Sequence, residues 1–333
     1  MTSPQSFLII QTAFIGDVIL ATALVEKLRD SFPEASIDFL LRKGNEDLLK
    51  GHPNIRHTLI WDKRKDKIKN LVGIIKMVRA NRYDYVINVH RFASSGFITA
   101  FSGAKQKTGF DKNPLSFLYD TKVKHQIGNS IHEVQRNQLL ISSLTNEQPS
   151  KPKLYPSVKD FAIVKNITKS STPYICIAPT SVWFTKQFPK EKWIELINEL
   201  ESSIPIYLLG AKADQTVCEV IKSNDTQNRV VNLAGQLSFL ESAALMKGAS
   251  MNYVNDSAPM HIASAVNAPV TAVYCSTVPA FGFGPQSDKK FIIESKEKLS
   301  CRPCGLHGFK ACPQGHFKCA TTIEIQDLKF KME

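Results

Sequence analysis

The sequence predicts an α/β protein built from two doubly wound, Rossmann-like domains, each with a parallel sheet between layers of helices. A chain of 333 residues is longer than one core usually requires and fits two domains of ordinary size. Short apolar strands alternate with helices in both halves, which indicates parallel sheets. A change of composition separates the halves. We therefore expect one domain over residues 1–155 and another over residues 156–333.

The first half begins with the apolar strand Phe7–Ile10, followed by a turn and the amphipathic helix Val18–Phe32. Two further apolar runs, Ile37–Leu41 and Tyr85–Val89, are predicted strands. The order of strand, helix and strand requires a crossover connection and therefore a parallel sheet. Open sheets of this kind bind ligands beyond the carboxyl ends of their strands, so we expect functional side chains there.

The domain boundary lies between Thr145 and Thr172, where Pro, Ser, Lys and Asn replace the apolar pattern. The alternation then begins again. The predicted elements of the second half are strands Tyr174–Ala178, Ile206–Leu209, Met251–Val254 and Val270–Tyr274, and helices Lys190–Ser202, Leu237–Gly248 and Pro259–Val266. Two doubly wound units in one chain predict a ligand crevice between them.

The charge balance suits a polyanionic partner without choosing one. Lys plus Arg (42) exceed Asp plus Glu (30), which gives a net charge of +12 and leaves nucleic acid, phosphorylated lipid and nucleotide open. The basic stretch from Lys63 through Lys76 carries apolar residues at helical spacing: Ile68, Leu71, Val72, Ile75 and Val78. We interpret this stretch as an amphipathic helix with a solvated basic face, with a membrane-docking face as the alternative.

The sequence contains neither a membrane span nor a secretion signal. No apolar stretch approaches the length of a membrane helix, and Met1–Ser6 lacks the basic start and cleavage site of a signal peptide. We expect a soluble, cytoplasmic protein. Its seven cysteines should then be mostly reduced thiols.

The turn after the first strand carries Gly16 and Asp17. A dinucleotide-binding turn would need three glycines to admit a pyrophosphate, so a nicotinamide cofactor is not expected here. Asp17 instead places a carboxylate at the carboxyl end of a strand, where it could act as a general base. The alternative is an acidic residue that stabilises the helix N-terminus.

Two segments of the second half are suited to an anion. The loop Pro179–Pro189 combines hydroxyls with Lys186, a plausible phosphate site, although a single Lys is more often a surface residue. The segment Asn255–His261 follows a strand and begins a helix. The free N–H groups of its first turn could hold a diphosphate without a metal, with His261 as a further donor. The alternative is an ordinary N-cap with a partly buried His.

Together these segments resemble glycosyltransferase family 9, the ADP-heptose:lipopolysaccharide heptosyltransferases, over nearly the whole chain. The matching segments are Ile15-Gly16-Asp17-Val18, Trp183-Phe184-Thr185-Lys186-Gln187-Phe188-Pro189 and Asp256-Ser257-Ala258 with His261. The resemblance implies a GT-B fold, with two Rossmann-like domains facing a central cleft. It makes Asp17 the catalytic base and Lys186 a contact to the donor phosphate.

The resemblance also implies further donor contacts: Thr180, Ser181, Asp214, Leu237, Asp256, Ser257, Ala258 and His261. In this assignment Asp214 meets the donor ribose and Leu237 lines the adenine pocket. Ala258 stands where the family often has Gly, and its methyl group leaves the backbone N–H available. His132 and Arg136 match a family position that serves packing or the crevice wall.

The implied activity is inverting, metal-independent transfer of a heptose from ADP-L-glycero-D-manno-heptose to the phosphorylated inner core of lipopolysaccharide. An anionic acceptor agrees with the basic charge balance, and Lys105 and Lys107 are candidate contacts to it. Peripheral contact with the inner face of the cytoplasmic membrane is compatible with this acceptor. Nucleic acid is not an expected partner.

Four cysteines near the end of the chain, Cys301, Cys304, Cys312 and Cys319, have a spacing that could hold a structural zinc. Reduced thiols or a disulfide-closed loop are the alternatives. No catalytic role is expected for them.

Two other functions remain open. One is a transferase of the same fold with a different nucleotide sugar or acceptor, because family membership specifies the diphosphate site better than the sugar pocket. The other is a basic protein that binds nucleic acid or a membrane surface without catalysis. Its expected features, aromatic residues interleaved with the basic runs, are missing.

Overall fold

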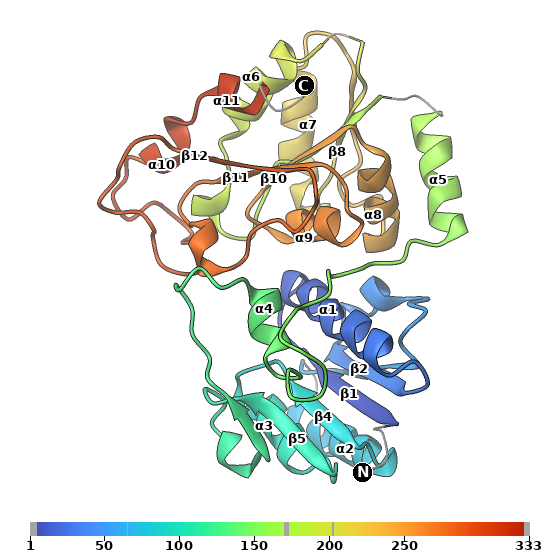
Figure 1. Ribbon diagram of the computed structural model, residues 1–333. Helices are drawn as coiled ribbons and strands as arrows, with labels where there is room; N and C mark the ends of the chain where they lie inside the picture. The colour runs from blue at the N-terminus through green and yellow to red at the C-terminus, as the bar shows by residue number, and fades with distance from the viewer. Residues whose placement is uncertain (1–4, 65, 170–172, 202, 330–333) are drawn as a thin grey trace. The chain divides into compact units, whose positions relative to one another are not determined.

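The computed structural model describes residues 5–64, 66–169, 173–201 and 203–329. It divides the chain into two compact units, Met1–Tyr155 and Pro156–Glu333 (Figure 1). Each unit contains one six-stranded parallel sheet covered by helices. The predicted α/β class with two doubly wound units is thereby confirmed.

In the first unit the sheet has the strand order β3-β2-β1-β4-β5-β6. Its elements are β1 Ser6–Ile10, α1 Ile15–Ser31, β2 Ser36–Arg42, η1 Glu46–Leu49, β3 His57–Trp61, α2 Lys67–Ala80, β4 Tyr85–Asn88, α3 Ala93–Ala100, β5 Gln106–Phe110, η2 Ser116–Leu118, β6 Thr121–Val123 and α4 Glu133–Gln138. The strands β1, β2 and β4 lie where the apolar runs predicted them. Because both faces of the sheet are covered, these strands are apolar throughout rather than alternating.

The helix α2 corrects the prediction for the basic stretch. Of the predicted apolar stripe only Val78 is fully buried, while Ile74, which the prediction omitted, also enters the core. Ile68 and Val72 are 79% and 45% exposed. The helix therefore has a narrow buried face and an outer face that is partly apolar. Lys65 of the basic stretch lies outside the described residues.

In the second unit the sheet has the order β12-β11-β10-β7-β8-β9. Its elements are α5 Val158–Thr168, β7 Ile175–Ala178, η3 Phe184–Lys186, α6 Lys190–Glu199, β8 Ile206–Leu208, η4 Lys212–Asp214, α7 Gln215–Ser223, β9 Val230–Asn232, α8 Phe239–Gly248, β10 Met251–Asn255, α9 Ala258–Ala265, β11 Val270–Tyr274, η5 Pro279–Phe281, β12 Lys290–Glu294, α10 Lys318–Thr321 and α11 Ile325–Lys329. The helix predicted to run to Ser202 ends at Glu199, and Ser202 lies outside the described residues.

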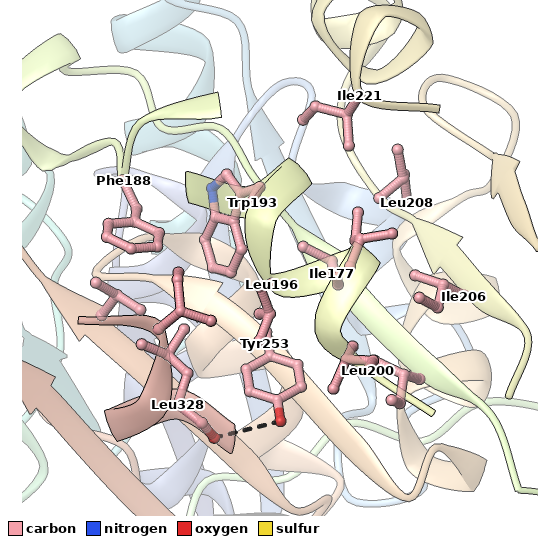
Figure 2. Packing of buried hydrophobic residues seen from close by; sticks show 14 of the residues in the cluster. Ile177, Phe188, Trp193, Leu196, Leu200, Ile206, Leu208, Ile221, Tyr253 and Leu328 are labelled. Carbon is pink, nitrogen blue, oxygen red and sulfur yellow. Dashed lines mark hydrogen bonds between the residues drawn. The ribbon is translucent and has the colours of Figure 1, made fainter. Parts of the chain in front are cut away.

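The core of the second unit holds the loop after β7 in place (Figure 2). The rings of Phe188 and Trp193 pack edge to face with their centroids 5.0 Å apart, and both side chains are fully buried. The Trp193 indole N–H donates to the Pro179 carbonyl over 3.3 Å. On the other side of the same cluster, the Tyr253 hydroxyl donates to the Leu328 carbonyl over 3.5 Å. The loop that carries Lys186 is thus anchored at both of its ends.

Both sheets have the same topology, with a reversal of strand order in the middle. The reversal lies between β1 and β4 in the first unit and between β7 and β10 in the second. Doubly wound sheets bind their ligands at the carboxyl ends of the strands next to this point. In the described part of the chain no helix is both long and apolar enough to span a bilayer.

Candidate active site

In the first unit a hydrogen-bonded cluster occupies the carboxyl ends of β1 and β4. The Thr12 hydroxyl is hydrogen-bonded to His90 Nδ1 over 3.2 Å. Lys63, which follows β3, donates from Nζ to the Thr12 carbonyl over 3.0 Å and to the Thr12 hydroxyl over 2.9 Å. The Asn113 amide donates to the His90 carbonyl over 3.1 Å. The edge where the strand order reverses is therefore polar and ordered.

Asp17 lies beside this cluster, in the first turn of α1. Its carboxylate accepts from the Phe14 N–H over 3.1 Å. Asp17 therefore stabilises the start of α1, which was the alternative to a role as general base. Burial raises the pKa of Asp17 to about 6, and the Glu133 carboxylate adds to the rise. A carboxylate with a pKa near neutrality is suited to accept a proton. The capping role and the role of base are therefore compatible.

The same edge carries positive charge. Burial lowers the pKa of Lys63 to about 8, with Arg42 and Lys67 adding to the effect. Burial also lowers the pKa of His90 to about 3 and that of His125 to about 4, and the charge of Arg91 adds to both shifts. The two imidazoles are neutral at physiological pH, because their charged forms are disfavoured by burial and by neighbouring cations. An anionic ligand is favoured at such an edge.

Other predicted residues of the first unit have structural partners. The Arg136 guanidinium pairs with the Glu133 carboxylate at 2.6 Å, and His132 Nδ1 accepts from the Val134 N–H at the start of α4. Lys105 pairs with Asp84 at 2.7 Å and Lys107 with Asp120 at 3.3 Å.

The last two lysines do not lie with the polar cluster. Lys105 precedes β5 and Lys107 lies near its start, so both are at the amino edge of the sheet. Parallel strands all begin at that edge, and the cluster around His90 lies where they end. Lys105 and Lys107 therefore lie at the opposite edge of the sheet from Asp17 and His90, and their contact with an acceptor stays a prediction.

In the second unit Lys186 and Asp256 form an ion pair with 2.7 Å between Nζ and Oδ2. Lys186 ends the short helix η3 after β7, and Asp256 directly follows β10. The Thr277 hydroxyl donates to Asp256 Oδ2 over 2.6 Å. Since both members of the pair are largely buried, their positions are well defined by their partners.

The ion pair lies at the start of α9. Ser257 is the N-cap residue, with an extended backbone at φ −156° and no capping bond from its side chain. Ala258 and Pro259 begin the first turn. Pro259 has no N–H and the Met260 N–H donates to the Ser257 carbonyl over 3.1 Å, so the Ala258 N–H is the candidate donor to a ligand. His261 follows one turn later and is buried. A helix start next to a buried ammonium is an arrangement that can bind a diphosphate.

The remaining predicted donor residues follow the neighbouring strands of the same sheet. Thr180 and Ser181 follow β7, Asp214 follows β8 and Leu237 follows β9. Together with Asp256 after β10, they occupy one carboxyl edge across four adjacent strands. Asp214 also accepts from the Ala211 N–H over 2.7 Å, which fixes its loop. The structure thus brings these residues to a single edge although they are far apart in sequence.

Two residues that organise this edge, Thr277 and Arg302, were missed by the sequence interpretation. Thr277, which holds Asp256, follows β11, so its place after an apolar strand was the available signal. Arg302 binds three backbone carbonyls at the end of β11, among them that of Thr277 over 2.7 Å. No local pattern could have identified Arg302, because its partners are about 25 residues away in the sequence.

The cysteine-rich segment packs against the Lys186 loop. The Phe309 N–H donates to the Thr185 hydroxyl over 2.8 Å, and the Thr185 N–H donates to the Phe309 carbonyl over 3.1 Å. The Cys304 N–H donates to the Ser276 carbonyl over 2.8 Å. This segment therefore holds the Lys186 loop in place through hydrogen bonds to the backbone and to the hydroxyl of Thr185.

A structural zinc is not supported. Cys301, Cys304, Cys312 and Cys319 are free thiols, and among the described residues no three His, Cys, Asp or Glu side chains are grouped closely enough to hold a metal ion. Cys301 Sγ lies 3.8 Å from His316 Nε2. The alternative of a disulfide-closed loop is not observed either.

A sequence profile of glycosyltransferase family 9 (heptosyltransferase) matches residues 72–307. This chain belongs to glycosyltransferase family 9. The chain is also 28% identical over 289 residues to lipopolysaccharide heptosyltransferase 3 of Escherichia coli K12, covering 80% of this chain and 81% of that protein. The family assignment makes the protein a glycosyltransferase.

Solved structures show the same fold as this family 9 chain. The Escherichia coli ADP-heptose lipopolysaccharide heptosyltransferase II superimposes with a TM-score of 0.78 at 22% identity, covering 98% of both chains. A family 9 glycosyltransferase of Veillonella parvula reaches a TM-score of 0.87 at 18% identity, with 100% of this chain and 98% of that chain covered. The expected GT-B fold is confirmed.

A more distant structure, the dodecameric iron-containing heptosyltransferase TibC, has a TM-score of 0.60 at 13% identity over 100% of this chain and 76% of its own. At this identity the likeness concerns the fold alone. Metals therefore occur in proteins of this fold, and metal independence needs a test of its own.

Proposed function

We propose that this protein transfers a heptose from ADP-L-glycero-D-manno-heptose to the inner core of lipopolysaccharide with inversion of configuration. The observation that carries the proposal is the Lys186–Asp256 ion pair at the first turn of α9. It lies beside the reversal of strand order, where a nucleotide diphosphate would bind. The names of the relatives, lipopolysaccharide heptosyltransferases, support the choice of sugar and acceptor.

In the proposed reaction Asp17 accepts the proton of the acceptor hydroxyl as that hydroxyl attacks the anomeric carbon. The bond from this carbon to the diphosphate breaks, and ADP leaves with the bonding electrons. Attack from the opposite face inverts the configuration. The raised pKa of Asp17 matches the base to its task near neutral pH.

Lys186 and the first turn of α9 stabilise the charge that grows on the leaving diphosphate. Preorganised donors of this kind lower the barrier most when they need no rearrangement, and the bonds from Thr277 and Arg302 provide that rigidity. We assign Thr180, Ser181, Ser257, Ala258 and His261 to the same diphosphate. In this proposal Asp214 meets the ribose and Leu237 the adenine.

The acceptor is assigned to the first unit, at the positive edge around Lys63 and Arg91. A phosphorylated core matches that charge. We also propose that the reaction needs no metal, since an ammonium and a helix start can neutralise a diphosphate. A nucleotide-sugar donor places the reaction in the cytoplasm, and nucleic acid is not a partner in it.

The direct test is to incubate the protein with ADP-heptose and a deep-rough core acceptor and to measure the ADP released. We expect ADP release that depends on the acceptor and is unchanged by EDTA. Mass spectrometry of the products from a panel of nucleotide sugars tests the choice of donor. Transfer only from another nucleotide sugar would overturn the donor assignment, and loss of activity in EDTA would overturn metal independence.

The pH dependence of the reaction gives a further test. Because Asp17 acts as a carboxylate, kcat/KM should rise as the pH increases through about 6. Glu133→Gln removes a negative charge that raises the pKa of Asp17, so the rise of kcat/KM should move to lower pH. The amide oxygen of Gln can still accept from Arg136. A control variant, Glu147→Gln, should leave the pH of this rise unchanged. A rise at the wild-type pH in Glu133→Gln would contradict the assignment.

A further inference from the structure

The outer face of α2 combines exposed apolar and basic side chains. Ile68 and Val72 are 79% and 45% exposed and lie one turn apart. Lys69 and Lys76 are exposed on the same outer side of the helix. An exposed apolar pair on a helix whose other side is already packed against the sheet indicates a surface for a partner.

Helix α3 extends this surface. Phe97 and Phe101 are 41% and 48% exposed, and their rings stack with the centroids 6.2 Å apart. The two helices pack against each other, and the Arg79 guanidinium on α2 donates to the Phe101 carbonyl over 3.3 Å. We call the surface formed by Ile68, Lys69, Val72, Lys76, Phe97 and Phe101 the α2–α3 face.

The charge of this face selects among partners. Helix α2 contains Lys67, Lys69, Lys76 and Arg79 and no acidic residue. Among the described ion pairs none involves the three lysines. A second copy of this chain, with its net charge of +12, would be repelled. Apolar side chains flanked by these lysines fit the interface of an anionic lipid bilayer. The apolar side chains would enter the headgroup region, and the lysines would contact lipid phosphates.

The position of the face agrees with a lipid-linked acceptor. Helix α2 follows β3 and α3 follows β4, so both helices begin at the carboxyl edge of the sheet. Asp17 and His90 lie at that edge. Ile68 and Lys69 are in the first turn of α2, so this end of the face is next to the edge that an acceptor with its lipid in the bilayer would have to reach.

We propose that the α2–α3 face docks onto the anionic surface of a lipid bilayer. The choice of a bilayer rests on the proposed function, since lipopolysaccharide carries its own lipid. The docking is peripheral and reversible, because two short apolar patches and a few charges bind an interface without spanning it.

Sedimentation with vesicles tests the proposal. We expect the protein to bind phosphatidylethanolamine vesicles that contain phosphatidylglycerol and to bind phosphatidylcholine vesicles weakly. The variants Ile68→Ser/Val72→Ser and Lys69→Glu/Lys76→Glu should each bind the anionic vesicles roughly tenfold less. All four positions are on the surface, so folding should be preserved, and circular dichroism verifies it.

Matched control variants come from the second unit. Val158→Ser/Val220→Ser removes exposed apolar side chains, and Lys159→Glu/Lys165→Glu reverses two exposed charges on α5. Both should bind like the wild type. Equal binding of the face variants and the wild type would overturn the proposal. So would a wild-type dimer that the face variants convert to monomers in sedimentation velocity.

A second readout separates this proposal from the proposed function. With a deacylated, water-soluble core acceptor the face variants should release ADP at the wild-type rate, whereas with acceptor embedded in anionic vesicles they should be slower. No ADP release by the wild type with either acceptor would contradict the transferase assignment, while vesicle binding would still report on docking. Equal rates of variants and wild type on embedded acceptor would contradict docking alone.

Discussion

Replacing Asp17 with Asn should lower kcat by roughly two to four powers of ten and leave the donor Kd nearly unchanged. Asn keeps an oxygen that can accept from the Phe14 N–H, so the start of α1 should be preserved. What it loses is the ability to take the proton of the attacking hydroxyl. Steady-state kinetics of ADP release, with donor affinity from calorimetry, measure the two effects separately.

The chain offers a matched control for the capping role of Asp17. Asp160 occupies the third position of α5 and accepts from the Ser157 N–H, as Asp17 does from Phe14. Asp160→Asn should have a small effect on the melting temperature and none on kcat. A rate for Asp17→Asn that stays within a few-fold of the wild type would restrict Asp17 to helix capping.

Replacing Lys186 with Met should lower kcat/KM by roughly two to three powers of ten. It should also weaken the donor Kd by roughly ten- to a hundredfold. Met has a similar length and no charge, so the change removes the ammonium that pairs with Asp256. It also leaves a largely buried carboxylate next to the diphosphate site, which adds repulsion to the lost attraction. Donor titration and steady-state kinetics measure both.

The double variant Lys186→Met/Asp256→Asn separates these two effects. If repulsion from the uncompensated carboxylate contributes, the double variant should bind the donor more tightly than Lys186→Met alone. Lys190→Met, a half-exposed lysine at the start of α6, is the control and should bind like the wild type. Unchanged donor affinity and turnover in Lys186→Met would remove Lys186 from the diphosphate site.

The sequence predicted the strands that cross the middle of each sheet better than those at its edges. The central strands β1, β7 and β10 are buried on both faces, so their apolar runs are unmistakable. The edge strands β6 and β9 have three residues each. Unlike the equally short β8, which is buried throughout, both have exposed side chains. Their apolar pattern is therefore weak, and neither strand was predicted.

Some of the candidate residues could be recognised from local sequence, and others only from contacts in the folded chain. Asp17 is in the first turn of α1, Lys186 in the loop after β7 and Asp256 directly after β10. All three belong to segments that follow predicted strands, so local sequence could propose them. Lys105 and Lys107 were proposed from the charge balance, which contains no information about the edge of the sheet at which β5 begins. The supports of the site, Thr277 and Arg302, act through contacts that are distant in sequence.

By itself the sequence determined the α/β class, the two-unit organisation and the family. These depend on burial patterns and short motifs that can be recognised from residues close together in the sequence. Only the tertiary structure decided that Lys186 is paired with Asp256, that burial and Glu133 together raise the pKa of Asp17, and that Ile68 and Val72 remain exposed. Each of these depends on which segments meet in space, and helical or strand periodicity contains no information about partners from another segment.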